Sequence, residues 1–366
     1  MHSIPDITFV GGGITALLSA RLFAIAGANV TIIEKSRIGQ ESSWAGGGIL
    51  LPLYPWRQKD AISQLTIPSI QAYPELAQTL HESTGIDPEY TVSGLLMTEL
   101  ADLDKARDWC AKYAIDGCTA NPAQQKIFPQ CKGRSLYLKD IAQVRNPRLL
   151  KSIKQDLLQR GVKIVENCSI NKIQISHNRI TSIASAAENF SVNHVVIAAG
   201  AWTGDLCRQL FAQTKQVQAD IFPVKGQMLI LDAAENTLDT IVLEDDRYLI
   251  PRRDGKILCG STVEYTDFDK STSEQAKQSL VDFARKLFPA LESAPIIHHW
   301  AGLRPGTQLG IPFIDKHPEI SNLAINAGHF RNGFAMGPAA AQLLYEIITN
   351  QPTSIDAGLY QFSASH

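Results

Sequence analysis

Residues 6–34 read DITFVGGGITALLSARLFAIAGANVTIIE, and this stretch decides the fold. It predicts a short strand, a glycine turn, a helix, a second strand and a terminal carboxylate. Gly11-x-Gly13-x-x-Ala16 fits the dinucleotide-binding fingerprint, in which the small residues permit a tight turn, close approach to a pyrophosphate and packing of helix on strand. Glu34 follows Gly11 by 23 residues, close to the spacing expected of a ribose ligand. The stretch predicts a dinucleotide site without choosing between NAD and FAD. An ordinary βαβ turn is the alternative.

The composition excludes several classes of protein. The chain has 366 residues, of which 45% are hydrophobic, so it can bury a large core and form two domains. A net charge of −2 gives no indication of binding to nucleic acid or to an anionic membrane surface. No apolar run approaches the ~20 residues of a membrane span, and no signal peptide fits before the first strand, so we expect a cytoplasmic location.

No metal site is expected from the cysteines and histidines. None of the six cysteines forms a CxxC pair, so they are most simply reduced thiols. His298 and His299 are adjacent, and adjacent residues on a strand point to opposite faces, which makes a poor metal site.

Two kinds of segment alternate along the chain. The spacing of apolar residues predicts helices at 66–82, 101–115, 147–161, 273–288 and 334–348. It predicts strands at 162–165, 170–175, 179–184 and 323–327, a strand that runs into a glycine turn at 194–202, and antiparallel sheet at 222–231, 241–251 and 256–260. We therefore predict an α/β fold with two discontinuous domains. A Rossmann-like dinucleotide-binding domain comprises residues 1–55, 140–210 and 320–366, and an α+β domain with a mixed, largely antiparallel sheet comprises 56–139 and 211–319.

Several motifs in the same order resemble the glycine oxidase branch of the D-amino-acid oxidase family. They are the N-terminal fingerprint, ESSWAGGGIL (41–50), VVIAAGAW (195–202), PVKGQM (223–228), DDRYLIPRRDG (245–255), WAGLRPGT (300–307) and GHFRNG (328–333). The resemblance covers nearly the whole chain. It implies that the Rossmann-like domain binds FAD and that the α+β domain binds the substrate.

The resemblance also implies which residues contact FAD. The N-terminal set is Gly11, Gly13, Ile14, Thr15, Ala16, Glu34, Lys35, Ser42, Ser43, Ala45, Gly46 and Gly47, along the adenosine, the diphosphate and the flavin. The later set is Ile170 beside the adenine, Gly200 at the last Rossmann strand, and His329, Arg331, Asn332 and Gly333 beside the isoalloxazine. Similar sarcosine oxidases hold flavin through a cysteine thioether. No cysteine lies in the last two motifs, so we expect noncovalent FAD.

Three residues are predicted to form the catalytic end of the site. Arg304 has a planar guanidinium suited to a bidentate grip on an amino-acid carboxylate, and similar proteins bind the carboxylate at this position. Tyr248 could donate to the same carboxylate, or be a core tyrosine. Arg331 could border the substrate cavity, organise its loop, or pair with Asp246.

The resemblance implies FAD-dependent oxidative deamination of glycine, sarcosine and small D-amino acids. Hydride would pass from Cα to flavin N5, giving a 2-oxo acid such as glyoxylate, ammonia or an amine, and, with O2, hydrogen peroxide. It also suggests a supply of glycine imine for thiamine thiazole synthesis and a homotetramer. The alternatives are a dehydrogenase with another electron acceptor and a noncatalytic flavin-binding subunit.

Overall fold

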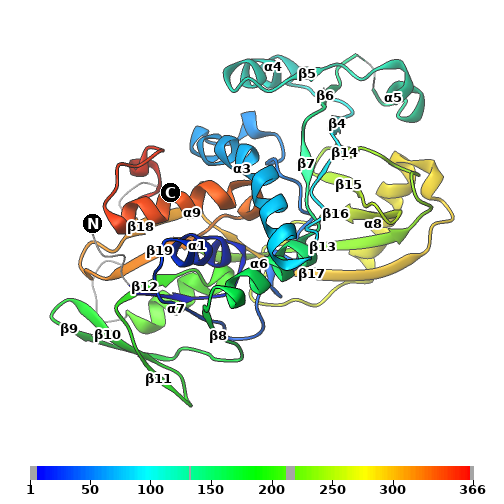
Figure 1. The fold of residues 1–366 in the computed structure, drawn as a ribbon. Helices are drawn as coiled ribbons and strands as arrows, with labels where there is room; N and C mark the ends of the chain where they lie inside the picture. Colours follow the sequence, from blue (N-terminus) through cyan, green and yellow to red (C-terminus); the bar gives the residue numbers. More distant parts are fainter. Residues whose placement is uncertain (1–5, 132, 212–218, 363–366) are drawn as a thin grey trace.

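Two large β-sheets frame the molecule in the computed structural model, which describes residues 6–131, 133–211 and 219–362 (Figure 1). The first sheet has the order β18-β19-β12-β1-β2-β8. Its strands are β18 (Phe313–Lys316), β19 (Leu323–Ala327), β12 (His194–Ile197), β1 (Ile7–Val10), β2 (Val30–Ile33) and β8 (Lys163–Val165). All neighbours are parallel except β18 and β19. The fingerprint strand β1 therefore lies inside a parallel sheet.

Helices cover one face of this sheet. They are α1 (Ile14–Ile25), α3 (Asp60–Thr84), α6 (Asn146–Gln159) and α9 (Gly333–Thr349), and they pack on one another in the large core beneath the sheet (Figure 1). Both faces of β1 are covered, so all four of its residues are buried, and all but Thr8 are apolar, as expected for a central parallel strand.

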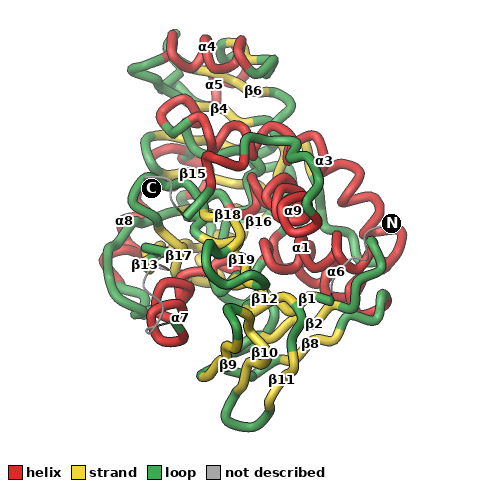
Figure 2. Tube along the Cα trace, turned by 90° about the vertical axis from the view of Figure 1, so that its left-hand side faces the viewer, coloured by secondary structure: helices red, strands yellow, loops and turns green. Residues whose placement is uncertain are grey.

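The opposite face is covered by a small sheet and a helix. They are β9 (Lys172–Ser176), β10 (Arg179–Ala184), β11 (Asn189–Ser191) and α7 (Thr203–Leu210), which share a second apolar cluster with β1, β2 and β12. This small sheet lies at one end of the molecule, and α4 (Leu103–Lys112) and α5 (Pro122–Ile127) lie at the other (Figures 1 and 2).

The second large sheet has the order β17-β13-β16-β15-β14-β4-β6-β5. Its strands are β17 (Ile296–Gly306), β13 (Phe222–Asp232), β16 (Lys256–Gly260), β15 (Arg247–Pro251), β14 (Ile241–Glu244), β4 (Leu95–Met97), β6 (Leu136–Leu138) and β5 (Gly117–Cys118). Only β14 and β4 are parallel, so the predicted mixed, largely antiparallel sheet is confirmed. Helix α8 (Glu274–Leu287) packs on β13 and β16.

Short elements complete the described chain. They are α2 (Ser42–Ala45), the strand pair β3 (Thr91–Val92) and β7 (Ala142–Gln143), and the 3-10 turns η1 (Pro55–Arg57), η2 (Gly200–Trp202), η3 (Pro289–Leu291) and η4 (Ala357–Tyr360). None of the helices in the described ranges is long and apolar enough to cross a membrane.

Two predicted elements differ from the structure. The helix expected at 66–82 begins at Asp60, because buried Ala61 and Ile62 extend its apolar face into the core, and it ends before Gly85, which has a φ of 70°. The antiparallel sheet expected at 241–251 is divided into two strands that pair as a hairpin, because Asp245 turns the chain with a φ of 50° between β14 and β15.

We keep the division into an FAD-binding and a substrate domain as a proposal. The segments proposed for the FAD-binding domain supply β1, β2, β8, β12 and β19 of the first sheet. Strand β18 precedes the proposed boundary at residue 320, yet it pairs with β19. Helix α3 follows the boundary at residue 55, yet it packs on α6 and α9.

His317, in the turn between β18 and β19, makes stability sensitive to acid. Its buried Nδ1 accepts hydrogen bonds from the N–H groups of Glu319 and Ile320, each at 2.9 Å, so this nitrogen must be unprotonated. Burial lowers the pKa of His317 from 6.5 to about 4. Between these values the unfolded chain binds the extra proton, so stability falls as the pH falls.

We expect His317→Asn, which cannot titrate, to flatten this dependence. Between about pH 7.5 and about pH 4.5, the wild type should lose on the order of 2 kcal/mol more stability than the variant. Denaturant unfolding at both pH values measures the difference. If the wild type and the variant lose equal stability, His317 is not the group that causes the pH dependence.

Candidate active site

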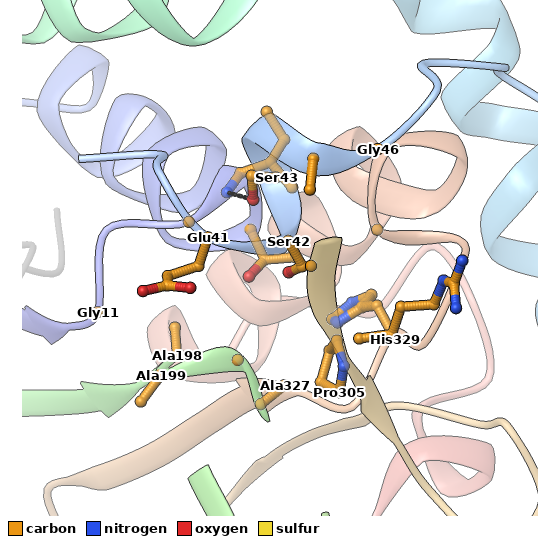
Figure 3. Close-up of a pocket in the computed structure, with 18 of the residues that line it drawn as sticks. Gly11, Glu41, Ser42, Ser43, Gly46, Ala198, Ala199, Pro305, Ala327 and His329 are labelled. Atoms are coloured by element: carbon orange, nitrogen blue, oxygen red, sulfur yellow. Dashed lines mark hydrogen bonds between the residues drawn. The ribbon is translucent and has the colours of Figure 1, made fainter. Parts of the chain in front are cut away.

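One cavity extends from the carboxyl ends of β1, β2 and β12 to the second sheet (Figure 3). It is lined by every residue predicted for the cofactor and the substrate, except Ala16. The lining residues are Gly11, Gly13, Ile14, Thr15, Glu34, Lys35, Ser42, Ser43, Ala45, Gly46, Gly47, Ile170, Gly200, Tyr248, Arg304, His329, Arg331, Asn332 and Gly333. Ala16 is fully buried in α1. The side chain agrees with the packing part of its predicted role, and only the backbone N–H of Ala16 is left to meet a ligand.

Gly11 sits where β1 meets β12. Its φ is 115°, and a Cβ at this position would lie 2.3 Å from the carbonyl oxygen of Ala198. No side chain fits in that space, and the backbone conformation itself disfavours one. Gly11 therefore allows the chain to turn from β1 into α1 directly beside the end of β12.

The amino end of α1 opens into the cavity. Ser43 Oγ accepts the N–H of Ile14 at 3.0 Å, which is the contact drawn in Figure 3. Within the described part of the chain, the N–H groups of Thr15 and Ala16 have no acceptor. Unpaired N–H groups and the positive end of the helix dipole make this position suited to a phosphate.

Glu34 and Lys35 follow β2 at the same edge of the sheet. Glu34 is buried and accepts the N–H of Gly12 at 2.7 Å, together with the N–H and the hydroxyl of Ser36 at 2.9 and 3.0 Å. A carboxylate has about four acceptor positions, so one remains for a ribose hydroxyl. The Lys35 ammonium lies 3.0 Å from the centre of the Trp202 ring, and burial lowers the pKa of Lys35.

Arg304, on β17, forms the other end of the cavity. Its Nη1 donates to the carbonyl oxygens of Lys225 and Thr262 at 3.3 and 3.1 Å, and its Nη2 donates to Ser261 Oγ at 2.8 Å. These bonds leave the Nε–H and one Nη2–H, on adjacent nitrogens, for a ligand. A Cβ at Gly226 would lie 2.1 Å from Nη2, so this glycine makes room for the guanidinium.

Comparisons with known proteins identify the class of site. The family described as FAD dependent oxidoreductase matches residues 6–347. The chain is 41% identical to glycine oxidase of Pseudomonas putida over 97% of both chains. It is 28% identical to the bifunctional protein ThiO/ThiG of a Synechocystis species, over 97% of this chain and 53% of that protein. The crystal structure of glycine oxidase from Geobacillus kaustophilus superposes with a TM-score of 0.89 at 25% identity, covering 99% of each chain.

The chain belongs to the FAD dependent oxidoreductase family. The resemblance to its glycine oxidase branch, the fold class and the assignment of FAD as cofactor are confirmed. The likenesses also support FAD-dependent amino-acid oxidation as the broad activity. The roles of individual site residues and the noncovalent attachment of FAD stay predictions.

The cavity of this FAD-dependent oxidoreductase fits the cofactor in two further respects. His329 is buried in the wall with no hydrogen-bond partner for Nε2, and burial lowers its pKa to about 3, so the ring is neutral. At Gly200, which has a φ of 57°, a Cβ would meet no atom within 4 Å, so the cavity is open beside it. An unpaired buried nitrogen and bare backbone are consistent with a wall that faces a polar, planar ligand.

Arg331 does not form the ion pair with the Asp246 carboxylate that the sequence left open. Its Nη2 donates to the backbone carbonyl of Asp246 at 3.4 Å and to Ser261 Oγ at 3.2 Å. Asn332 is tied to the loop before α3, because its amide donates to Gln58 Oε1 at 3.0 Å. Among the described residues, no group of three His, Cys, Asp or Glu side chains could hold a metal ion.

Sequence reasoning missed several residues of the site. Trp202, Met228 and Gly226 line the cavity, and Ser261 lies behind Arg304. Trp202 and the PVKGQM residues stand in motifs that the sequence singled out, but nothing in those motifs indicates which residue faces the cavity.

We expect Gly11→Ala to abolish tight FAD binding, because its Cβ would displace the end of β12 from beside α1. FAD affinity should fall by at least about tenfold, and stability should fall by more than the ~1 kcal/mol cost of a left-handed residue. The FAD-to-protein ratio after gel filtration and the unfolding midpoint measure both effects. The matched control is Gly27→Ala, which also has a positive φ, 90°, but would meet no atom within 4 Å. Equal behaviour of the two variants would contradict the steric explanation.

Proposed function

We propose that this enzyme oxidises glycine and other small amino acids, such as sarcosine and small D-amino acids, with O2 as the electron acceptor. For glycine, one molecule each of O2 and water would be consumed, and glyoxylate, ammonia and hydrogen peroxide would form. The observation that carries this proposal is that Arg304 and Tyr248 both lie in the wall of the cavity that fits FAD. The likeness to proteins named glycine oxidase supports the choice of substrate.

Arg304 would bind the substrate carboxylate. Its two remaining N–H groups form part of a rigid plane that three hydrogen bonds already hold in place. Little conformational freedom is lost when such a guanidinium binds a carboxylate, and the resulting hydrogen bonds are charge-assisted.

Tyr248, on β15, would donate to the same carboxylate. Its side chain is buried, and its hydroxyl lies 3.7 Å from Met228 Sδ, a weak acceptor. The hydroxyl can therefore turn to a stronger acceptor when a substrate enters. Together the two residues would fix the carboxylate and so orient the Cα–H bond.

Among the described residues that line the cavity, no carboxylate belongs to the second sheet, which carries Arg304. Within the described residues, the acidic side chains that line the cavity are Glu34, Glu41 and Asp205, which lie after β2, before α2 and in α7. Bound FAD would supply the two-electron acceptor for a hydride from Cα and return the electrons to O2. The protein would supply orientation, and hydrolysis of the released imine would complete the reaction.

We also propose that the imine product supplies thiazole synthesis for thiamine. The support is the match to the relative named ThiO/ThiG, in which this chain corresponds to about half of the length. A cytoplasmic location and a homotetramer remain predictions from the sequence.

A substrate panel with glycine, sarcosine, D-alanine and D-proline tests the function. We expect glycine to bleach the visible flavin band without air, and to yield one peroxide per glycine in air. Bleaching without peroxide would instead indicate a dehydrogenase with another acceptor. An absence of bleaching by every amino acid would contradict catalysis of this kind.

Arg304→Ala should weaken substrate binding. The loss of a charge-assisted pair costs ~3 kcal/mol, so KM for glycine should rise about a hundredfold. The control is Arg247→Ala, since Arg247 donates to Ser279 in α8 and does not line the cavity. An unchanged KM in a folded, FAD-loaded Arg304→Ala protein would remove Arg304 from the site.

A further inference from the structure

Arg304 and Arg331 share one hydrogen-bond acceptor. The Nη2 atoms of both guanidiniums donate to Ser261 Oγ, at 2.8 and 3.2 Å. Arg304 belongs to β17, Arg331 to the turn before α9, and Ser261 to the residues just after β16. Three segments that are distant in sequence therefore meet at a single oxygen atom.

Neither guanidinium is neutralised by the protein. Across the described residues, the ion pairs include no carboxylate partner for Arg304 or Arg331. Tyr248 and then Glu264 act in the opposite direction to burial and raise the pKa of Arg304, and Glu264 is the carboxylate of the two. That carboxylate accepts from Gln227 and Thr262 at 2.8 and 2.5 Å and pairs with the Lys225 ammonium at 3.3 Å.

The two positive charges act on each other. Burial and the neighbouring Arg331 guanidinium lower the pKa of Arg304 to about 10. A hydroxyl oxygen has two lone pairs and no charge, so Ser261 can hold both guanidiniums in place but cannot balance them. One substrate carboxylate would balance one positive charge and leave the other without a partner.

Ser261 holds the pair from behind. Its side chain is 3% exposed and does not line the cavity, whereas Arg304 and Arg331 both do. A ligand in the cavity would therefore meet two arginines that donate to the same oxygen atom, and it would not have to displace the serine.

We propose that Ser261 is a positioning residue that couples Arg304 and Arg331 into a site for small ligands with two anionic groups, including amino dicarboxylic acids. The proposal rests on the proposed function in one respect, the assignment of Arg304 to the carboxylate. It adds a second anionic position at Arg331 and a preference for dianions over monoanions of the same size.

The test compares malonate with malonamate, which has the same size but an amide in place of one carboxylate. Each is titrated into the FAD-loaded enzyme at low salt, and the Kd is read from the change in the visible flavin spectrum, without turnover. We expect malonate to bind at least about tenfold more tightly, because a second charge-assisted contact forms. Equal Kd values would overturn the proposal.

Three variants distinguish a role of Ser261 in positioning the two arginines from a general effect on folding. Arg331→Gln should reduce the preference to about unity while malonamate still binds. Ser261→Ala should reduce the preference and weaken both ligands, whereas Ser261→Thr, which keeps the hydroxyl, should restore it. Ser279→Ala is the matched control, because Ser279 Oγ also accepts from an arginine, Arg247, at 2.8 Å, but outside the cavity. A preference that survives Arg331→Gln would overturn the proposal even if the Ser261 variants fail to fold.

The outcome is separable from that of the proposed function. If malonate is preferred but no amino acid bleaches the flavin, the two-cation site stands and the proposed oxidation fails. If glycine bleaches the flavin but malonate and malonamate bind equally, the oxidation stands and the two-cation site fails.

Discussion

The close approach of β1 to the end of β12 is the constraint on which the rest of the cofactor side depends. Only a residue without a side chain fits 2.3 Å from the Ala198 carbonyl oxygen, and Gly11 provides it. That contact places the amino end of α1 beside the carboxyl ends of the parallel strands. There Ser43 Oγ accepts the N–H of Ile14, and the Glu34 carboxylate accepts the N–H of Gly12. Phosphate attraction, ribose recognition and helix packing are thus consequences of one backbone-to-backbone contact.

At the substrate end of the cavity, glycines again allow a close approach, here on an antiparallel sheet. Gly226 and Gly302 lie opposite each other in the β13–β17 pair. A Cβ at Gly226 would collide with the Arg304 guanidinium, and a Cβ at Gly302 would lie 2.5 Å from Ala45 Cβ in α2. Gly226 therefore leaves room for the Arg304 guanidinium, and Gly302 allows α2 to pack directly against the sheet. The two ends of the cavity are close because side chains are missing where the sheet meets α2.

The sequence predicted local features well, because these follow from short-range rules. The fingerprint at Gly11 and Gly13, the fold class and the family need only nearby residues and the order of motifs. Contacts between distant segments could not be derived. The register of β13 against β17 decides that Gly226 faces Arg304, and the meeting of Ser261 with Arg304 and Arg331 brings together three segments that are distant in sequence. Ala16 shows a second limit, since the sequence counts it with the residues that contact the ligand, whereas its side chain is buried in the core and only its backbone N–H stays at the amino end of α1.

The late return of the chain to the first sheet has a consequence for biosynthesis. Strand β12 lies between β1 and β19, and β19 and α9 are made after almost all other described elements. During translation, one edge of β12 has no partner until residues 323–327 leave the ribosome, so the nascent parallel sheet keeps an open edge while the whole stretch between β12 and β19 is made. The predicted FAD contacts at residues 328–333 follow β19 directly, so the wall of the cavity is complete only once this last segment has been made.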